Sequence, residues 1–207
     1  MPPSTRAKRE QTVGVPGNDV WIPSGPRLGR VARRRPEIMT LTTILPSLRR
    51  SIPDPFVPDR WPAHTHLSTT DVIVDDVPML RLIEQCGTPC VHTATAVIAG
   101  TGGCPSPVEQ TSVVVTRVVA ATFGEDGHHL TLDACLADVE PCWSELRLIG
   151  RASTTHTVSF HLDSEAGTEQ RVLLPRDLAP GDLLAVPCRG AVAQAVGSAS
   201  GFIQNGE

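Results

Sequence analysis

The sequence predicts a mainly β protein, a single small β-barrel domain with one or two short helices. About eight short runs rich in β-branched residues are separated by Gly- and Pro-containing turns, and no alternating series of strands and helices is present. Aromatic residues make up only 3% of the chain, so the core must be built from Val, Leu, Ile and Ala. A chain of 207 residues forms about one domain and can bury a core without stabilising disulfides or metal ions.

Two strands and a helix open this pattern. Residues 71–75 predict a short strand, and Asp76 and Pro78 then give the N-terminal signal of a helix. Gly87 ends that helix, because glycine readily adopts the left-handed backbone that follows a helix. The β-branched residues of 90–98 predict the next strand.

A Gly- and Pro-rich segment follows at 100–107. Its composition is typical of a turn or linker, and we expect a linker over 99–111. A phosphate-binding glycine loop is the alternative interpretation. However, no Gly-Lys-Ser or Gly-Lys-Thr follows, and the next predicted element is a strand rather than a helix whose N-terminus could bind phosphate. The composition therefore favours a linker.

The densest β signal begins at 112. Residues 112–122 place apolar side chains on both faces, which predicts a strand covered on both sides. Residues 124–127 predict a hairpin turn into a strand at 129–132. Further strands are predicted over 145–149, 155–162, 170–174 and 182–187, with a turn at 163–167 and a loop at 175–181.

Residues 1–38 differ in composition from the rest of the chain. They hold eight of the 18 basic residues, three of the 22 acidic residues and six of the 19 prolines. We expect a disordered basic arm, with Met39 as an alternative start of the protein. An arm that docks on an acidic partner or on nucleic acid is the functional alternative. Residues 197–207 are expected to form a tail, which leaves a domain over 39–196.

Charge and hydropathy restrict the class of partner and the compartment. A net charge of −4 and a pI near 6.0 argue against general nucleic-acid binding. No run approaches the roughly 18 apolar residues of a membrane helix, and no export signal follows the arginines. We therefore expect a cytoplasmic protein that contacts neither membrane nor nucleic acid.

The six cysteines lack the CxxC pairing of structural zinc sites. Without an export signal, they are expected to be reduced, half-buried side chains rather than metal ligands or disulfides.

Five histidines are candidate acids, bases or ligands for an unrelated activity. Ordinary structural roles compete with that hypothesis. His156 falls on the apolar register of its strand, and His128 and His129 would be solvated at a hairpin tip. His161 lies near Asp163. The candidates are His92, His128, His129, His156 and His161.

Several short motifs occur in a recognisable order. They cover 45–49, 59–62, 72–79 and 86–89, then 133–138 with 140–141, 148–151, 161–164, 174–175, and 180–187 with 190–191. Together they resemble the diaminopimelate decarboxylase family, within the pyridoxal-phosphate-dependent class that also contains ornithine and arginine decarboxylases. The motif over 180–187 is the most specific.

The resemblance implies a β-domain like the C-terminal domain of alanine racemase and diaminopimelate decarboxylase. An N-terminal segment, 41–98, would be joined by the linker 99–111 to a closing segment, 112–196. In the family a TIM barrel of about 250 residues separates the two segments and carries the lysine that binds pyridoxal phosphate. Here that barrel is missing, and Lys8 is the one lysine in the sequence.

The family's functional positions are replaced. The Cys-Glu-Ser whose cysteine serves as an acid falls on Leu162, Asp163 and Ser164, and the tyrosine near the cofactor falls on Val192. In the substrate-binding stretch, Asp133 is followed by residues that lack the family's two glycines, and Asp138 lies between it and Glu140. The arginine that binds a substrate carboxylate is matched by Glu140, whose charge should repel such a substrate.

These replacements predict a degenerate β-domain that is inactive alone and acts as a binding or partner subunit. No cofactor is expected on the chain alone, and pyridoxal phosphate only where a partner completes the site. The expected partner is a second copy or a barrel-bearing decarboxylase homologue, because the family's active sites form across a subunit interface. The alternative is a component of an active pyridoxal-phosphate-dependent diaminopimelate or amino-acid decarboxylase.

Overall fold

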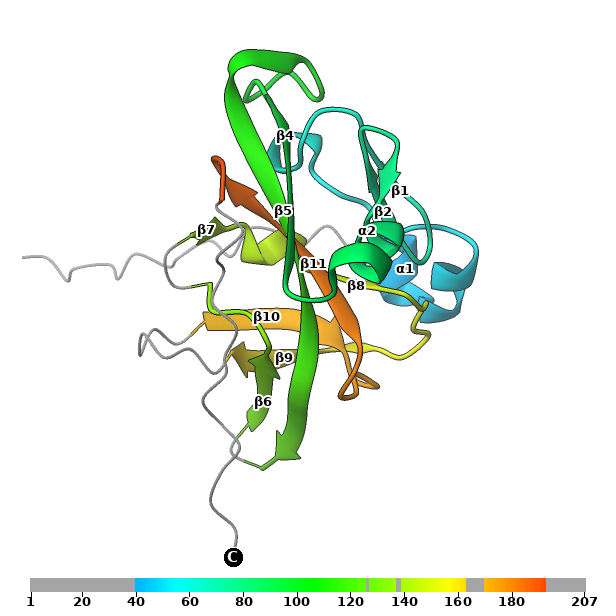
Figure 1. Cartoon of the computed structure of the whole chain (residues 1–207). Coiled ribbons are helices and arrows are strands. Elements are labelled where there is room, and N and C mark those ends of the chain that lie inside the picture. Colours follow the sequence, from blue (N-terminus) through cyan, green and yellow to red (C-terminus); the bar gives the residue numbers. More distant parts are fainter. Residues whose placement is uncertain (1–39, 126, 137–138, 163–169, 193–207) are drawn as a thin grey trace, which may run out of the picture. The chain divides into compact units, whose positions relative to one another are not determined.

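The computed structural model describes residues 40–125, 127–136, 139–162 and 170–192. Within this part the protein is mainly β, as predicted, with one large and one small sheet (Figure 1). The large sheet runs in the order β10-β9-β6-β5-β11-β7, with β4 added to β5 and β8 added to β11. This path has two ends among the described residues, so the predicted closure into a barrel is not confirmed.

The N-terminal segment contributes short helices and the small sheet. Its turn between β2 and β3 is formed by Asp75 and Asp76, whose φ values of 47° and 63° suit a tight hairpin turn. The elements are α1 (Leu41–Ile44), η1 (Pro46–Arg50), η2 (Pro58–Arg60), β1 (Thr65–Leu67), β2 (Val72–Val74) and β3 (Val77–Pro78).

Helix α2 (Met79–Cys86) occupies the position predicted from sequence. Met79 and Ile83 are buried, one turn apart on the same face. Gly87 follows with a φ of 74° and ends the helix, as expected. The N-terminal acceptor is Asp71 rather than Asp76, since Asp71 Oδ1 accepts a hydrogen bond from the Leu80 amide at 3.2 Å.

Strands β4 (Cys90–Val97) and β5 (Pro105–Gly124) form a long hairpin. The predicted linker over 99–111 is therefore too long, because β5 already begins at Pro105. Pairing decides this difference: Pro105 lies opposite Val97, and Gln110 lies opposite Thr95. A cross-strand ladder can order a segment whose composition alone suggests a loop.

Strand β5 joins the two halves of the large sheet. Its N-terminal part pairs with β4 and with β11 (Leu183–Arg189), and its C-terminal part pairs with β6 (Gly127–Leu132). The register shifts between Val118 and Ala120, where the strand changes partners. Such an irregularity bends a strand and increases its twist.

The remaining strands come from the closing segment. Strand β6 runs parallel to β9, whereas the other pairings of the large sheet are antiparallel. The elements are β7 (Glu140–Pro141), η3 (Trp143–Glu145), β8 (Arg147–Ile149), β9 (Thr157–Leu162) and β10 (Gln170–Pro175). The predicted turn over 163–167 lies outside the described residues.

Two hydrophobic clusters lie on opposite faces of β5. Val114 and Val118 belong to the first cluster, which the closing strands fill. Val113 and Val115 belong to the second, together with Trp61 from the N-terminal segment. The predicted burial on both faces is thus confirmed for the part of β5 over 112–116, whereas Val119 is 53% exposed. The two segments share one sheet through the β4–β5 pairing.

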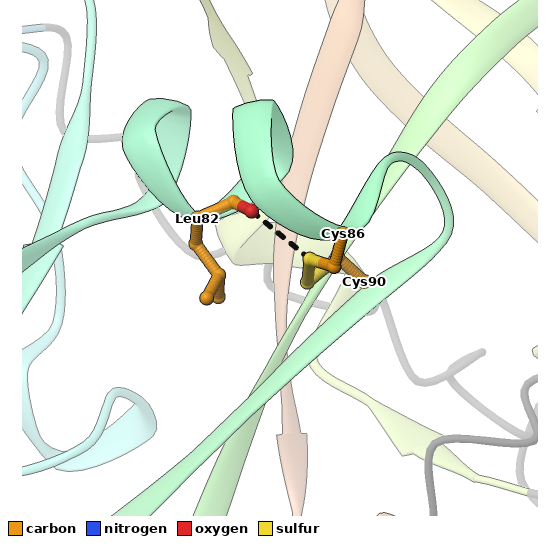
Figure 2. Close-up of a disulfide and its surroundings, with 3 residues drawn as sticks. All are labelled: Leu82, Cys86 and Cys90. Atoms are coloured by element: carbon orange, nitrogen blue, oxygen red, sulfur yellow. Dashed lines mark hydrogen bonds between the residues drawn. A yellow bond between two sulfur atoms is a disulfide. The ribbon is translucent and has the colours of Figure 1, made fainter.

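Two of the cysteines predicted to be reduced form a disulfide. Cys86, the last residue of α2, is bonded to Cys90, the first residue of β4 (Figure 2). The prediction from composition was wrong for this pair, because the turn between them brings their Cα atoms to 6.5 Å, within disulfide range. Cys104, Cys135, Cys142 and Cys188 are free.

None of the helices in the described part of the chain is long and apolar enough to cross a membrane.

Candidate functional site

Two motifs of the resemblance meet in a bidentate ion pair. Arg151 follows β8, and Asp182 precedes β11. Arg151 donates from Nε to Asp182 Oδ1 at 2.8 Å and from Nη2 to Asp182 Oδ2 at 2.6 Å. A two-point contact of this kind fixes orientation as well as charge. These motif residues therefore connect the end of β8 to the start of its neighbour β11.

Asp177 extends the same network. Its Oδ2 accepts from Arg151 Nη1 at 3.0 Å, and its Oδ1 accepts from Ser153 Oγ at 2.6 Å and Thr155 Oγ1 at 3.0 Å. Burial acts to raise the pKa of Asp177, but these hydrogen bonds and the Arg151 charge together lower it below its ordinary value. The hydrogen bond to Asp182 is the largest cause of the raised pKa of Arg151.

A buried polar cluster joins the N-terminal segment to the closing segment. Glu145 is only 6% exposed, and its Oε2 accepts from the indole Nε1 of Trp61 at 3.0 Å and from the amide of Val57 at 3.3 Å. Arg147 Nη2 lies 3.6 Å from the same oxygen. Burial lowers the pKa of Arg147, and the charge of Glu145 opposes this shift.

Arg147 also donates hydrogen bonds to the backbone of the N-terminal segment. Its Nη1 donates to the carbonyl of Asp54 at 2.9 Å, and its Nη2 donates to the carbonyl of Pro55. Its guanidinium carbon lies 6.0 Å from the ring centroids of both Phe56 and Trp61, within cation–π range. The sequence did not predict this cluster, because its two parts, 54–61 and 145–147, are more than 80 residues apart. Trp61 lies inside one of the motifs but gave no sign of its partners.

The glycine-rich loop binds a carboxylate of the chain itself. Asp59 accepts hydrogen bonds from the amide of Gly100 at 2.7 Å and from the amide of Gly102 at 2.8 Å. Neighbouring loop amides that point at one site attract anions. Since Asp59 already engages these two amides, the loop serves to fix the β4–β5 hairpin, in line with the turn interpretation.

The family's acid and tyrosine positions lie against an apolar core. Leu162 ends β9, is 8% exposed and belongs to the first hydrophobic cluster. Val192 packs on the same cluster, and its amide donates to Ser112 Oγ at 2.9 Å. Ser112 is fully buried and donates in turn to the carbonyl of Gly190 at 2.9 Å. Ser112 was not among the candidates from sequence, because it lies in a strand and its partners, Gly190 and Val192, are about 80 residues away.

The positions that the resemblance aligned with a substrate-binding stretch are separate from one another. Asp133 follows β6, and its Oδ1 accepts from Thr116 Oγ1 at 2.7 Å and from the amide of Arg117 at 2.8 Å. Its carboxylate therefore ties β5 to the end of β6. Glu140 is exposed on β7, where it lies opposite Arg189 of β11.

Asp138, Asp163 and Ser164 lie outside the described residues. Of the four described family positions, Leu162 and Val192 share a hydrophobic cluster, while Asp133 and Glu140 make separate contacts. These four do not form a convergent set of acid, base and nucleophile.

Two of the histidines do not occupy the expected environments, whereas His129 is exposed as expected. His128 was expected to be solvated, but its ring lies 5.2 Å from that of Phe123 and 5.7 Å from that of Phe160. The register of the hairpin directs it inward. His156 was placed on an apolar register, yet it precedes β9 and is exposed, because the strand begins at Thr157.

Two other histidines pair across strands. His129 of β6 lies opposite His161 of β9, and their rings stack with centroids 5.4 Å apart. His92 lies on β4, where its Nε2 is buried without a hydrogen-bond partner in the described part of the chain. Within residues 40–125, 127–136, 139–162 and 170–192, no three His, Cys, Asp or Glu side chains gather in a way that could hold a metal ion.

Comparison with solved structures found a partial likeness to a decarboxylase, whereas the sequence comparisons found nothing. No family model matches the sequence, and no curated protein matches it. Among solved structures, the chain is similar to the X-ray crystal structure of the arginine decarboxylase of Paramecium bursaria Chlorella virus, with 18% sequence identity and a TM-score of 0.29. The match covers 41% of this chain and 26% of that enzyme, so the likeness is partial in both.

Proposed function

We propose that the chain is a degenerate diaminopimelate-decarboxylase-like β-domain protein, non-catalytic alone, that acts as a binding or partner subunit. One contrast carries this proposal. The motif residues Arg151 and Asp182 make a bidentate ion pair, whereas Leu162 and Val192, at the family's acid and tyrosine positions, pack on an apolar cluster. Selection for catalysis would retain side chains that can exchange a proton, such as the family's cysteine and tyrosine, at the latter positions.

Pyridoxal phosphate does not fit the described residues. This cofactor needs a lysine amine for its Schiff base, and the sequence offers only Lys8, outside the described part. The amide of Val192 is already bonded to Ser112, and Leu162 offers no polar atom in its side chain. We therefore expect no functional complex of the chain alone with this cofactor.

The test combines cofactor trapping with an activity assay. The full-length protein is incubated with pyridoxal phosphate, reduced with borohydride and weighed intact, while carbon dioxide release from diaminopimelate is measured in parallel. We expect neither a stoichiometric adduct nor gas release. A complete diaminopimelate decarboxylase serves as the positive control, and Lys8→Arg identifies any adduct at the single lysine. Turnover by the chain alone would overturn the proposal.

The alternative is a component of an active pyridoxal-phosphate-dependent decarboxylase. The observation in its favour is the β4–β5 pairing, which joins the N-terminal and closing segments in one sheet as an assembled family β-domain would require. Addition of the chain to a barrel-bearing homologue separates the two readings. A rise in carbon dioxide release that depends on the chain would support this alternative against the non-catalytic role.

A further inference from the structure

The disulfide between α2 and β4 closes a very small ring. Only Gly87, Thr88 and Pro89 separate Cys86 from Cys90 (Figure 2). In the chain-entropy account, a disulfide stabilises a protein mainly by closing a loop of the unfolded chain, and short loops contribute least. The bond is therefore a weak structural staple.

Other contacts already hold the two elements that the disulfide connects. Met79 is fully buried and Ile83 is 8% exposed, and both belong to the second hydrophobic cluster. The amide of Gly87 donates to the carbonyl of Ile83 at 2.7 Å, which closes the end of α2. Cys90 lies in register with Val115 at the start of the β4–β5 ladder. The fold can thus persist when the disulfide opens.

The two sulfur-bearing residues differ in exposure. Cys86 is exposed at the end of α2, whereas Cys90 is only 3% exposed. Thiol–disulfide exchange requires a thiolate to reach one sulfur while the other leaves. An external thiolate can approach Cys86, with Cys90 as the leaving group.

A reduced Cys86 thiol would have a hydrogen-bond acceptor within reach. Cys86 Sγ lies 3.0 Å from the carbonyl oxygen of Leu82, one turn earlier in α2 (Figure 2). A disulfide sulfur carries no proton, so this contact becomes a hydrogen bond only after Cys86 is a thiol. The local backbone therefore accommodates both oxidation states.

We propose that the Cys86–Cys90 bond is a reversible thiol–disulfide exchange site that accepts low-molecular-weight thiols at Cys86. The incoming thiolate forms a bond to Cys86 Sγ, the Cys86–Cys90 bond breaks, and its electron pair leaves on Cys90, which takes up a proton. A second thiolate attacks the external sulfur and releases the small disulfide and the Cys86 thiol. Two small thiols are thereby oxidised, and one protein disulfide is reduced.

The free cysteines set the controls. Cys188 is fully buried, and burial raises its pKa to about 12, so it forms little thiolate at neutral pH. Cys104 is exposed and can react with small disulfides independently. The test is therefore carried out in a Cys104→Ser background, and the modified residue is located by peptide mapping.

The experiment compares two variants of the full chain in that background, Cys90→Ser and Cys86→Ser. Each is exposed to glutathione disulfide without denaturant, and mixed disulfides are counted by mass spectrometry. We expect Cys86 to be modified at least about tenfold faster than Cys90, because exchange follows access to the sulfur. Circular dichroism confirms that both variants are folded.

The parent with both cysteines is titrated in buffers of reduced and oxidised glutathione. We expect the bond to open and re-form reversibly, with a native circular dichroism spectrum at both extremes. Equal labelling of Cys86 and Cys90 in the folded variants would overturn the proposal. So would a bond that excess thiol opens only after unfolding.

Discussion

At the residue scale, three aspartate carboxylates connect parts of the chain that are distant in sequence. Asp59 binds the amides of the glycine-rich loop, Asp133 ties β5 to β6, and Asp182 binds Arg151. Each lies in a motif of the resemblance described above. The contacts satisfy backbone and side-chain donors and join parts of the chain that are distant in sequence.

Asp177 should make stability depend on acid pH. Its pKa is lowered in the folded protein, so its contribution is present above the ordinary aspartate pKa of about 3.9 and is lost as the pH falls through the lowered value. We expect Asp177→Asn to reduce the free energy of unfolding by about 1 kcal/mol at neutral pH, since the site is partly solvated.

The measurement is urea unfolding as a function of pH for the parent and Asp177→Asn. The difference between the two curves should shrink as the pH falls below about 4. Asp76→Asn is the matched control, because Asp76 is exposed and asparagine tolerates its φ of 63°. A constant difference at all pH values would contradict the assigned role.

At the element scale, polar contacts join the N-terminal segment to the closing segment, in addition to the second hydrophobic cluster. Strand β4 joins the large sheet by pairing, but the segment before it is held by Trp61, Glu145 and Arg147. A buried ion pair of this type can orient elements even where it adds little net stability. Removal of one partner is costly, because the other charge stays buried.

We expect Glu145→Leu to lower the free energy of unfolding by about 3 kcal/mol, because Arg147 and the Trp61 indole then lose their shared acceptor. Chemical unfolding measures the loss, and Trp fluorescence should report a changed environment of Trp61. Glu84→Leu, at an exposed position of α2, is the control. A loss at Glu145 no larger than at Glu84 would refute the docking role.

At the scale of the whole molecule, five of the ten large apolar side chains that are exposed in the described residues lie in one stretch of sequence. Those of 41–57 are between 45% and 66% exposed and comprise Leu41, Ile44, Leu45, Ile52 and Val57. Exposed apolar side chains that cluster can mark an interaction site. We propose a second copy of the chain as its partner, consistent with a role as an assembly subunit.

Light scattering at micromolar concentration tests this proposal. We expect a dimer for the parent and a shift to monomer for Ile44→Asp combined with Leu45→Asp, because charges at an apolar interface oppose association. Val108→Asp is the control, since Val108 is 85% exposed on β5 and lies outside this stretch. A monomeric parent, or a dimer unaffected by the double substitution, would contradict the proposed self-association. A complex with a barrel-bearing homologue would instead support the alternative partner.

Local pattern by itself determined most of the elements. The β-branched runs became β2, β4, β5 and β11, and Gly87 ended α2 where expected, because strand periodicity and backbone freedom act over a few residues. The two apolar faces of the run at 112–122 correctly indicated a strand covered on both sides over its first part, 112–116, but not at Val119, which is exposed.

Tertiary structure decided the features that need distant partners. The extension of β5 back to Pro105, the inward placement of His128 and the buried contacts of Glu145 arise from pairing and packing between segments far apart in the sequence. The disulfide depended on a turn that brought two nearby cysteines into range. Composition could not reveal these features, because they depend on which surfaces meet in space once the chain has folded.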